Sequence, residues 1–186
     1  REYAAGLAEV VKYGVLCDRD FYAWLERERE PLLQRDPAVL AHAIERSCAA
    51  KARIVAADER EGGQRALLNL GHTFAHAIEA GQGYGTWLHG EAVAAGMVLA
   101  ARLSAQRGWI SGVEVEGLVN WLQAMGLPVE PPEMPLDTWL GHMARDKKVI
   151  DGKLRLILLR AIGEAVIVDD VSAAELTSFL QGFSGV

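Results

Sequence analysis

The sequence predicts a mainly α fold, a compact multihelical array with one small β-hairpin near the C-terminus. Apolar residues recur at spacings of three and four over most of the chain, which is typical of amphipathic helices. Helix-start signals stand at residues 36–37 (Asp-Pro) and in capping boxes that begin at Ser111 and Ser172. Strand-like sequence is confined to residues 154–168. One core accounts for this length, so residues 1–186 are expected to form a single domain.

The composition is that of an ordinary globular protein, with 51% hydrophobic and 24% charged residues. A formal net charge of -6 without a long basic run argues against a nucleic-acid-binding protein. No apolar run is long enough to cross a bilayer, so no membrane partner is expected. Cys17 and Cys48 are too few for a disulfide framework, which favours a reducing, cytoplasmic location. The first residues resemble the middle of a helix, so we expect a fragment of a longer protein.

Three helices are expected at the start of the chain, over residues 2–13, 21–30 and 37–58. Glu9 and Lys12 lie three residues apart on one face of the first helix. A surface ion pair is the simpler interpretation. Because Glu9 lies between Ala8 and Val10 in a weakly polar helix, burial of its carboxylate is nevertheless favoured, and a buried carboxylate requires a partner.

For several positively charged side chains, the sequence leaves open whether they are exposed to solvent or belong to an anion-binding site. Lys51 lies beside the apolar stripe of the third helix, where its ammonium either reaches solvent or points into an anion pocket. Arg65 lies just ahead of the next helix, either as a surface arginine or as part of a phosphate or carboxylate site. Arg145, Lys147 and Lys148 are either solvated or an anion-binding loop.

Three of the five histidines, His72, His76 and His89, lie within eighteen residues. Asn69 and Thr86 are expected to cap two consecutive helices, which places His72 and His89 three residues after each cap, in a first turn. Exposed N–H groups and the helix dipole disfavour an imidazolium ion there. Neutral imidazole is the form that binds a divalent cation, so two such turns brought together predict a metal site.

His72, His76 and Glu79 share one helix face, at spacings of four and three. Two histidines four residues apart, with a third nearby, favour a metal site over incidental histidines. The pattern is not HExxH because Thr73 follows His72, and spacing leaves open whether His76 is a ligand or a proton carrier. The Gly-rich residues 81–85 follow a helix rather than a strand, so they are interpreted as a connection and not as a dinucleotide-binding loop.

Helices continue through the second half of the chain. An Ala- and Gly-rich helix over residues 88–106 is expected in the middle of the fold, because small side chains on several faces permit close packing. Three more helices are expected, over residues 111–125, over residues 136–144 and after Ser172.

Five stretches of the sequence resemble the C-terminal domain of the 3-dehydroquinate synthase family. They are residues 8–14 (AEVVKYG), Lys51 with 57–60 (ADER), 65–79, 87–93 (WLHGEAV) and 145–148 (RDKK), in the family's order. The resemblance implies an enzyme of the shikimate pathway, which supplies chorismate and the aromatic amino acids. It also implies a substrate that is an anionic, phosphorylated keto sugar acid.

The resemblance implies a divalent metal ion, zinc or cobalt, held by Glu9, His72 and His89. It also implies substrate contacts from Lys12, Lys51, Arg65, Asn69, His76 and one or both of Lys147 and Lys148. Within that set, His76, Lys12 and Asn69 are the expected catalytic residues, with His76 handling a proton rather than binding the metal.

The family's N-terminal, NAD-binding domain has no counterpart in this sequence. The resemblance therefore implies a missing partner half that holds NAD, a homodimer of the complete enzyme, and an isolated chain without turnover. The implied reaction is that of a lyase, converting 3-deoxy-D-arabino-heptulosonate 7-phosphate to 3-dehydroquinate and phosphate. Its steps are transient oxidation by NAD, phosphate elimination, re-reduction, ring opening and aldol closure.

Two other functions fit parts of the sequence. A metal-dependent alcohol dehydrogenase of the glycerol dehydrogenase type has a similar two-domain plan, but the lysines and Arg65 favour an anionic substrate over a neutral polyol. A non-catalytic helical binding module with incidental histidines would agree with the composition, but it leaves the ordered set of motifs unexplained.

Overall fold

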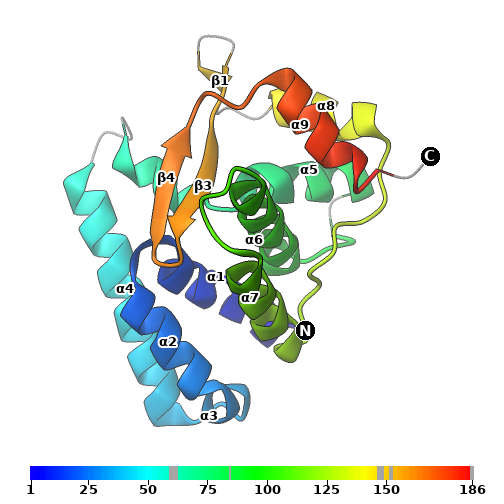
Figure 1. Cartoon of the computed structure of the whole chain (residues 1–186). Coiled ribbons are helices and arrows are strands. Elements are labelled where there is room, and N and C mark those ends of the chain that lie inside the picture. The colour runs from blue at the N-terminus through cyan, green and yellow to red at the C-terminus, as the bar shows by residue number, and fades with distance from the viewer. Residues whose placement is uncertain (59–62, 84, 146–148, 151–152, 185–186) are drawn as a thin grey trace.

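The computed structural model describes residues 1–58, 63–83, 85–145, 149–150 and 153–184. These residues form nine α-helices, one 3₁₀ helix and two short antiparallel hairpins (Figure 1). The predicted mainly α fold class is confirmed, and the expected hairpin is accompanied by a second, shorter one.

The first third of the chain forms a group of helices on one side of the molecule (Figure 1). Its members are α1 (Glu2–Cys17), α2 (Arg19–Arg27), α3 (Arg29–Leu33) and α4 (Pro37–Ala57). The predicted start of α4 is confirmed, because the Asp36 carboxylate accepts hydrogen bonds from the backbone N–H groups of Ala38 and Val39. The prediction of one helix over residues 21–30 was wrong, because this stretch is divided between α2 and α3.

Helix α1 also runs one turn beyond the predicted stop at Gly14. A Cβ at Gly14 would lie 2.9 Å from the Cα of Tyr22, so this glycine permits close contact between α1 and α2. The absence of a side chain at this position therefore serves packing rather than helix termination.

Helix α6 (His89–Gln106) is the centre of the fold, as its small residues predicted. Thirteen of its residues are buried. It packs against α1, against α5 (His72–Gln82), against α7 (Gly112–Ala124) and against strand β3 (Leu156–Ala161) (Figure 1). The 3₁₀ helix η1 (Gln64–Asn69) leads from α4 towards α5 and contacts α1.

The C-terminal part adds helices and hairpins around this centre. Its remaining elements are α8 (Leu136–Arg145), β1 (Val149–Ile150), β2 (Lys153–Leu154), β4 (Glu164–Val168) and α9 (Ala173–Gln181). Strands β3 and β4 pair antiparallel from Leu156 opposite Val168 to Ala161 opposite Glu164, which confirms the predicted hairpin. Both sheets in the described part of the chain are two-stranded, so these residues contain no doubly wound nucleotide-binding sheet.

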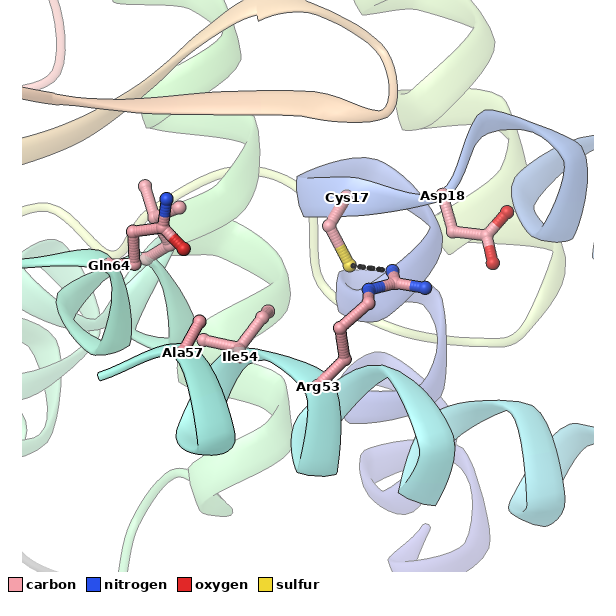
Figure 2. Close-up of a pocket in the computed structure, with 7 residues that line it drawn as sticks. Cys17, Asp18, Arg53, Ile54, Ala57 and Gln64 are labelled. Atoms are coloured by element: carbon pink, nitrogen blue, oxygen red, sulfur yellow. Dashed lines mark hydrogen bonds between the residues drawn. The ribbon is translucent and has the colours of Figure 1, made fainter. Parts of the chain in front are cut away.

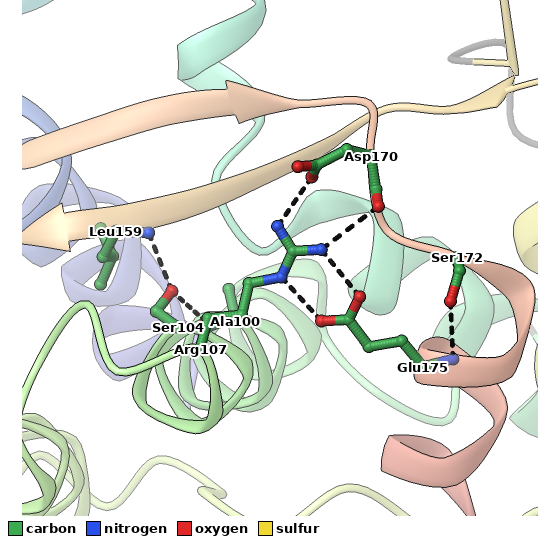
Figure 3. A network of polar contacts seen from close by, with 7 residues as sticks. All are labelled: Ala100, Ser104, Arg107, Leu159, Asp170, Ser172 and Glu175. Atoms are coloured by element: carbon green, nitrogen blue, oxygen red, sulfur yellow. Dashed lines mark hydrogen bonds and ion pairs between the residues drawn. The ribbon is translucent and has the colours of Figure 1, made fainter.

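Polar contacts near the C-terminal end of α6 join it to the hairpin and to α9 (Figure 3). The buried Ser104 hydroxyl donates to the carbonyl of Ala100 at 2.7 Å and accepts from the N–H of Leu159 at 2.9 Å. Arg107 donates to the carboxylates of Asp170 and Glu175. The core helix is thus connected to β3 and to the segment that begins α9.

Among the described residues, no helix combines the length and the apolar character that a membrane span requires.

Candidate metal centre

Two close helix crossings bring the start of α6 next to α1 and α5. A Cβ at Gly90 would lie 1.9 Å from the carbonyl oxygen of Ala5, and a Cβ at Gly96 would lie 2.2 Å from that of Gly71. Only glycine fits such contacts, so α1 and α5 approach the backbone of α6 directly. Glu9 lies one turn after Ala5, and the crossing therefore brings it near the start of α6.

His72 and His89 are the first residues of α5 and α6. The predicted placement in first turns is confirmed, but both predicted caps were wrong. The N-cap of α5 is Gly71, with a φ of 79° that favours glycine, and the N-cap of α6 is Leu88. Asn69 instead ends η1, and the Thr86 hydroxyl donates to the carbonyl of Gln82.

Glu9, His72 and His89 form a group of possible metal ligands. One ligand atom from each side chain lies within 4.8 Å of the other two. Their parent helices are α1, α5 and α6, which meet here from positions far apart in the sequence. The structure therefore brings together the three ligands that the resemblance implied.

The carboxylate of Glu9 is shared between two neighbours. Its Oε2 accepts a hydrogen bond from Lys12 Nζ at 2.6 Å. Its Oε1 is buried, has no hydrogen-bond partner, and lies 3.8 Å from His72 Nε2. A buried carboxylate oxygen without a partner is unfavourable, so this atom is suited to a cation.

Lys12 is 3% exposed, whereas the side chain of Glu9, for which the weakly polar helix suggested burial, is 34% exposed and has a buried Oε1. Burial lowers the pKa of Lys12, the Glu9 carboxylate opposes this effect, and the charge of Lys51 adds to it. The ammonium of Lys51 on α4 is therefore close enough to Lys12 to influence the electrostatics of the neighbouring group of possible metal ligands. Together the two lysines make the surroundings of this group attractive to an anion.

His72 is prepared for metal binding in both its tautomer and its charge. Because a carbonyl oxygen only accepts hydrogen bonds, the contact of Nδ1 with the Leu70 carbonyl at 3.1 Å places the proton on Nδ1 and leaves Nε2 bare. Burial, the larger cause, and the charge of Lys12 together lower the pKa of His72 to about 4. The lowered pKa favours the predicted neutral imidazole at His72, and desolvation rather than the helix dipole is its main cause.

His76 lies beside this group without belonging to it. Its ring centroid is 5.7 Å from that of His72 and 6.4 Å from that of His89. The side chain is exposed at the surface. His76 is therefore not among the possible ligands that the structure brings together.

The remaining predicted substrate contacts are less closely defined. Lys51 is exposed on α4, and Arg65 and Asn69 are half-buried on η1, which precedes His72 at the start of α5. Lys147 and Lys148 lie outside the described residues.

The donor set fits a catalytic zinc-type ion. One carboxylate and two imidazoles are a recurrent three-ligand set that leaves a fourth position for substrate or water. Two ligand atoms about 2 Å from one ion lie no more than about 4 Å apart. The 3.8 Å spacing of Glu9 and His72 meets this limit, and the widest spacing of the group needs a small contraction.

The contacts of two acidic residues near this group, Glu79 and Glu91, were missed in the sequence. Glu79 on α5 lies 3.2 Å from His89 Nδ1 through its Oε1. Glu91 accepts from the backbone N–H of Leu88 at 2.9 Å, and Arg1 donates to both oxygens of Glu91 at 2.6 and 2.7 Å. The shared face of Glu79 and the histidines was a usable signal for the first contact. Nothing local indicated the contact of Glu91 with Arg1, which joins residues ninety positions apart.

A separate pocket of about 500 Å³ lies between α1, α4 and η1 (Figure 2). Arg53 donates to the Cys17 sulfur at 3.7 Å across it, and burial raises the pKa of that thiol. None of the predicted site residues is among those that line this pocket.

Solved structures with the same fold define the class of protein. A 2-epi-5-epi-valiolone synthase from Streptomyces hygroscopicus, with NAD+ and Zn2+ bound, aligns with a TM-score of 0.86 and 28% identity, over 97% of this chain and 51% of that one. A 2-deoxy-scyllo-inosose synthase, complexed with carbaglucose-6-phosphate, NAD+ and Co2+, aligns with a TM-score of 0.74 and 21% identity, over 97% and 52%. The chain therefore has the fold of about half of such a synthase.

The particular family follows from the sequence comparisons. A family profile described as 3-dehydroquinate synthase C-terminal matches residues 6–149, so the chain belongs to this family. Curated 3-dehydroquinate synthases from Acinetobacter baumannii (strain SDF) and Pseudomonas syringae pv. tomato are 60% and 63% identical over 170 and 171 residues. Each alignment covers 91% of this chain but 47% of the relative. The chain thus spans about half the length of the curated relatives it matches.

Proposed function

We propose that this chain is the metal- and substrate-binding half of a 3-dehydroquinate synthase, a phosphate-eliminating lyase of the shikimate pathway. The other half, matching the part of the relatives that this chain does not cover, would hold NAD. The observation that carries the proposal is the convergence of Glu9, His72 and His89 beside the buried Lys12. A binding module with incidental histidines has no reason to bury a lysine against a possible metal ligand.

The ion that these residues would hold, zinc or cobalt, supplies Lewis-acid chemistry that acidifies a substrate hydroxyl and polarises the derived ketone. Lys12, Lys51, Arg65 and one or both of Lys147 and Lys148 neutralise the substrate's phosphate and carboxylate. The uncharged amide of Asn69 contacts the substrate through hydrogen bonds. His76 moves the proton of the reacting hydroxyl, unless the leaving phosphate serves as base.

The proposal favours an anionic substrate over the neutral polyol of a glycerol dehydrogenase. A lysine ammonium held at 2.6 Å from a possible metal ligand adds positive charge where a neutral polyol needs none. The family match agrees with this choice. Homodimerisation stays a prediction from the resemblance, and a cytoplasmic location stays a prediction from the small number of cysteines.

The test is a chimera in which this chain replaces the matching half of the Pseudomonas syringae relative. We expect it to release phosphate from 3-deoxy-D-arabino-heptulosonate 7-phosphate, with a requirement for NAD and a divalent metal. The chain alone should release none. NAD-dependent oxidation of glycerol by the chimera, without phosphate release, would instead assign the dehydrogenase function.

A further inference from the structure

We propose that Glu79 is a positioning residue of the metal centre, which accepts a hydrogen bond from His89 Nδ1–H and thereby directs His89 Nε2 towards Glu9 and His72. The inference rests on the metal centre in the proposed function and adds a residue that acts through a ligand. Its starting observation is the contact of 3.2 Å between His89 Nδ1 and Glu79 Oε1.

The contact determines the tautomer of His89. An ionised carboxylate accepts hydrogen bonds and donates none, so the proton of a neutral His89 must lie on Nδ1. The lone pair of Nε2 is then available to a metal ion. A carboxylate in this position also makes the imidazole a stronger electron donor, as in other metal sites where a carboxylate supports a histidine ligand.

His89 depends on such support more than His72 does. The ring of His72 is 12% exposed and is oriented by the backbone carbonyl of Leu70, which no substitution of a side chain removes. The ring of His89 is 48% exposed, and its Nδ1 is oriented by the side chain of Glu79. An exposed imidazole without this contact would be free to rotate away from the site.

The position of Glu79 argues against two simpler roles, stabilisation of its own helix and direct binding of the metal. Glu79 lies in the last turn of α5, where a negative charge opposes the helix dipole, so it does not stabilise its own helix. Its carboxylate is also outside the group of possible ligands formed by Glu9, His72 and His89. The side chain is 16% exposed, so its contact with His89 is partly shielded from water.

The experiment measures metal binding by the 186-residue chain with Glu79→Ala and Glu79→Gln. Zinc affinity is measured by competition with a chromophoric chelator, and the Co2+-loaded proteins give visible absorption spectra. Urea unfolding of the metal-free proteins reports any structural effect. The matched control is Glu45→Gln, which removes the same charge from an exposed position on α4.

We expect Glu79→Ala to weaken zinc binding by about 10- to 100-fold. Glu79→Gln should lose less, because the amide oxygen still accepts the hydrogen bond but carries no charge. Both variants should shift the Co2+ absorption bands while the metal-free proteins unfold at the wild-type urea concentration. Glu45→Gln should match the wild type in all three measurements.

Two results would overturn the role of Glu79 and leave the metal centre intact. One is wild-type zinc affinity and an unchanged Co2+ spectrum in Glu79→Ala. The other is a loss of affinity that accompanies an equal loss of stability in the metal-free protein, as a purely structural contact would produce. Failure of the wild-type chain to bind zinc or Co2+ would contradict the metal centre itself, and the role of Glu79 with it.

Discussion

Glu9 divides its two oxygens between a lysine ammonium and a possible metal position. Lys12 neutralises one oxygen at 2.6 Å, and the other is buried and unpaired. Lys12 thus binds one oxygen of the carboxylate and leaves the other facing His72. The pairing also explains why a buried lysine is tolerated, because its partner supplies the opposite charge that burial requires.

At the residue scale, the histidines of α5 offer a matched pair of variants. We expect His72→Ala to lose zinc affinity by more than about 100-fold, beyond the usual effect of an outer-sphere partner. His76→Ala should keep most of its zinc, because its ring lies 5.7 Å from that of His72 and outside the ligand group. Metal analysis after dialysis measures both, and stoichiometric zinc in His72→Ala would contradict its role as a ligand.

At the element scale, the metal group depends on how closely α1 and α5 approach α6. Gly90 and Gly96 remove the side chains that would hold these helices apart. The close approach brings residues from three helices within reach of one ion. Small residues in α6 therefore position chemistry as well as fill the core.

Gly90→Ala tests this crossing. Its new methyl group would lie 1.9 Å from the Ala5 carbonyl oxygen, so α1 must shift, and we expect a loss of about 1–3 kcal/mol in unfolding free energy together with weaker zinc binding. Gly6→Ala on α1 is the control, because nothing lies within 4 Å of its new methyl group. That change should stabilise the chain by about 0.5–1 kcal/mol. Urea unfolding measures both, and equal stability of the two variants would contradict the close contact.

Arg107 joins the end of α6 to Asp170 and Glu175 (Figure 3), and the contribution of these ion pairs to stability is expected to depend on pH. Its hydrogen bonds lower the pKa of Glu175 and of Asp170. A carboxylate with a lowered folded-state pKa stabilises the fold above its unfolded pKa, and this contribution is lost as the pH falls through the folded value. For Glu175 the loss begins near its ordinary pKa of 4.5 and continues below it.

We therefore expect Arg107→Gln to cost about 1 kcal/mol at neutral pH through its pairing with Glu175. The difference from the wild type should shrink as the pH falls below 4.5. Urea unfolding at pH 7 and at acid pH measures this change. Arg29→Gln, at an exposed position on α3, should have little effect at either pH. A constant difference across the range would exclude titration of the partner carboxylates as the cause.

At the scale of the whole molecule, the proposed ion joins the three helices that meet in the core. Because α1, α5 and α6 each supply one possible ligand, the complete site exists only in the folded chain. A ligand that binds only the folded state stabilises it in proportion to the logarithm of its concentration over Kd. Metal binding and folding are therefore expected to be coupled.

Removal of the metal should lower the melting temperature of the wild-type chain. With free zinc at a thousandfold excess over Kd, the stabilisation is about 4 kcal/mol. Thermal unfolding with and without a chelator measures it. The same comparison on His72→Ala should show no chelator effect, and an equal chelator effect in both proteins would contradict this coupling.

Most helices were predictable because their signals are local. Asp36 and Ser111 each accept a hydrogen bond from a backbone N–H two or three residues ahead, and both caps are found as predicted. The first-turn placement of His72 and His89 was also correct, although their caps were not. Gly71 and Leu88 escaped prediction because their conformations depend on the packing of α5 and α6 rather than on a capping side chain.

By itself the sequence determined the mainly helical fold class, most of the helices and the late hairpin, and the histidines able to bind a metal, because periodicity and side-chain chemistry act over a few positions. Only the tertiary structure decided which of these residues meet. The unpaired oxygen of Glu9, the support of His89 by Glu79 and the contact of Arg1 with Glu91 all follow from helix crossings. Those crossings depend on backbone contacts between residues far apart in the chain, which no local pattern encodes.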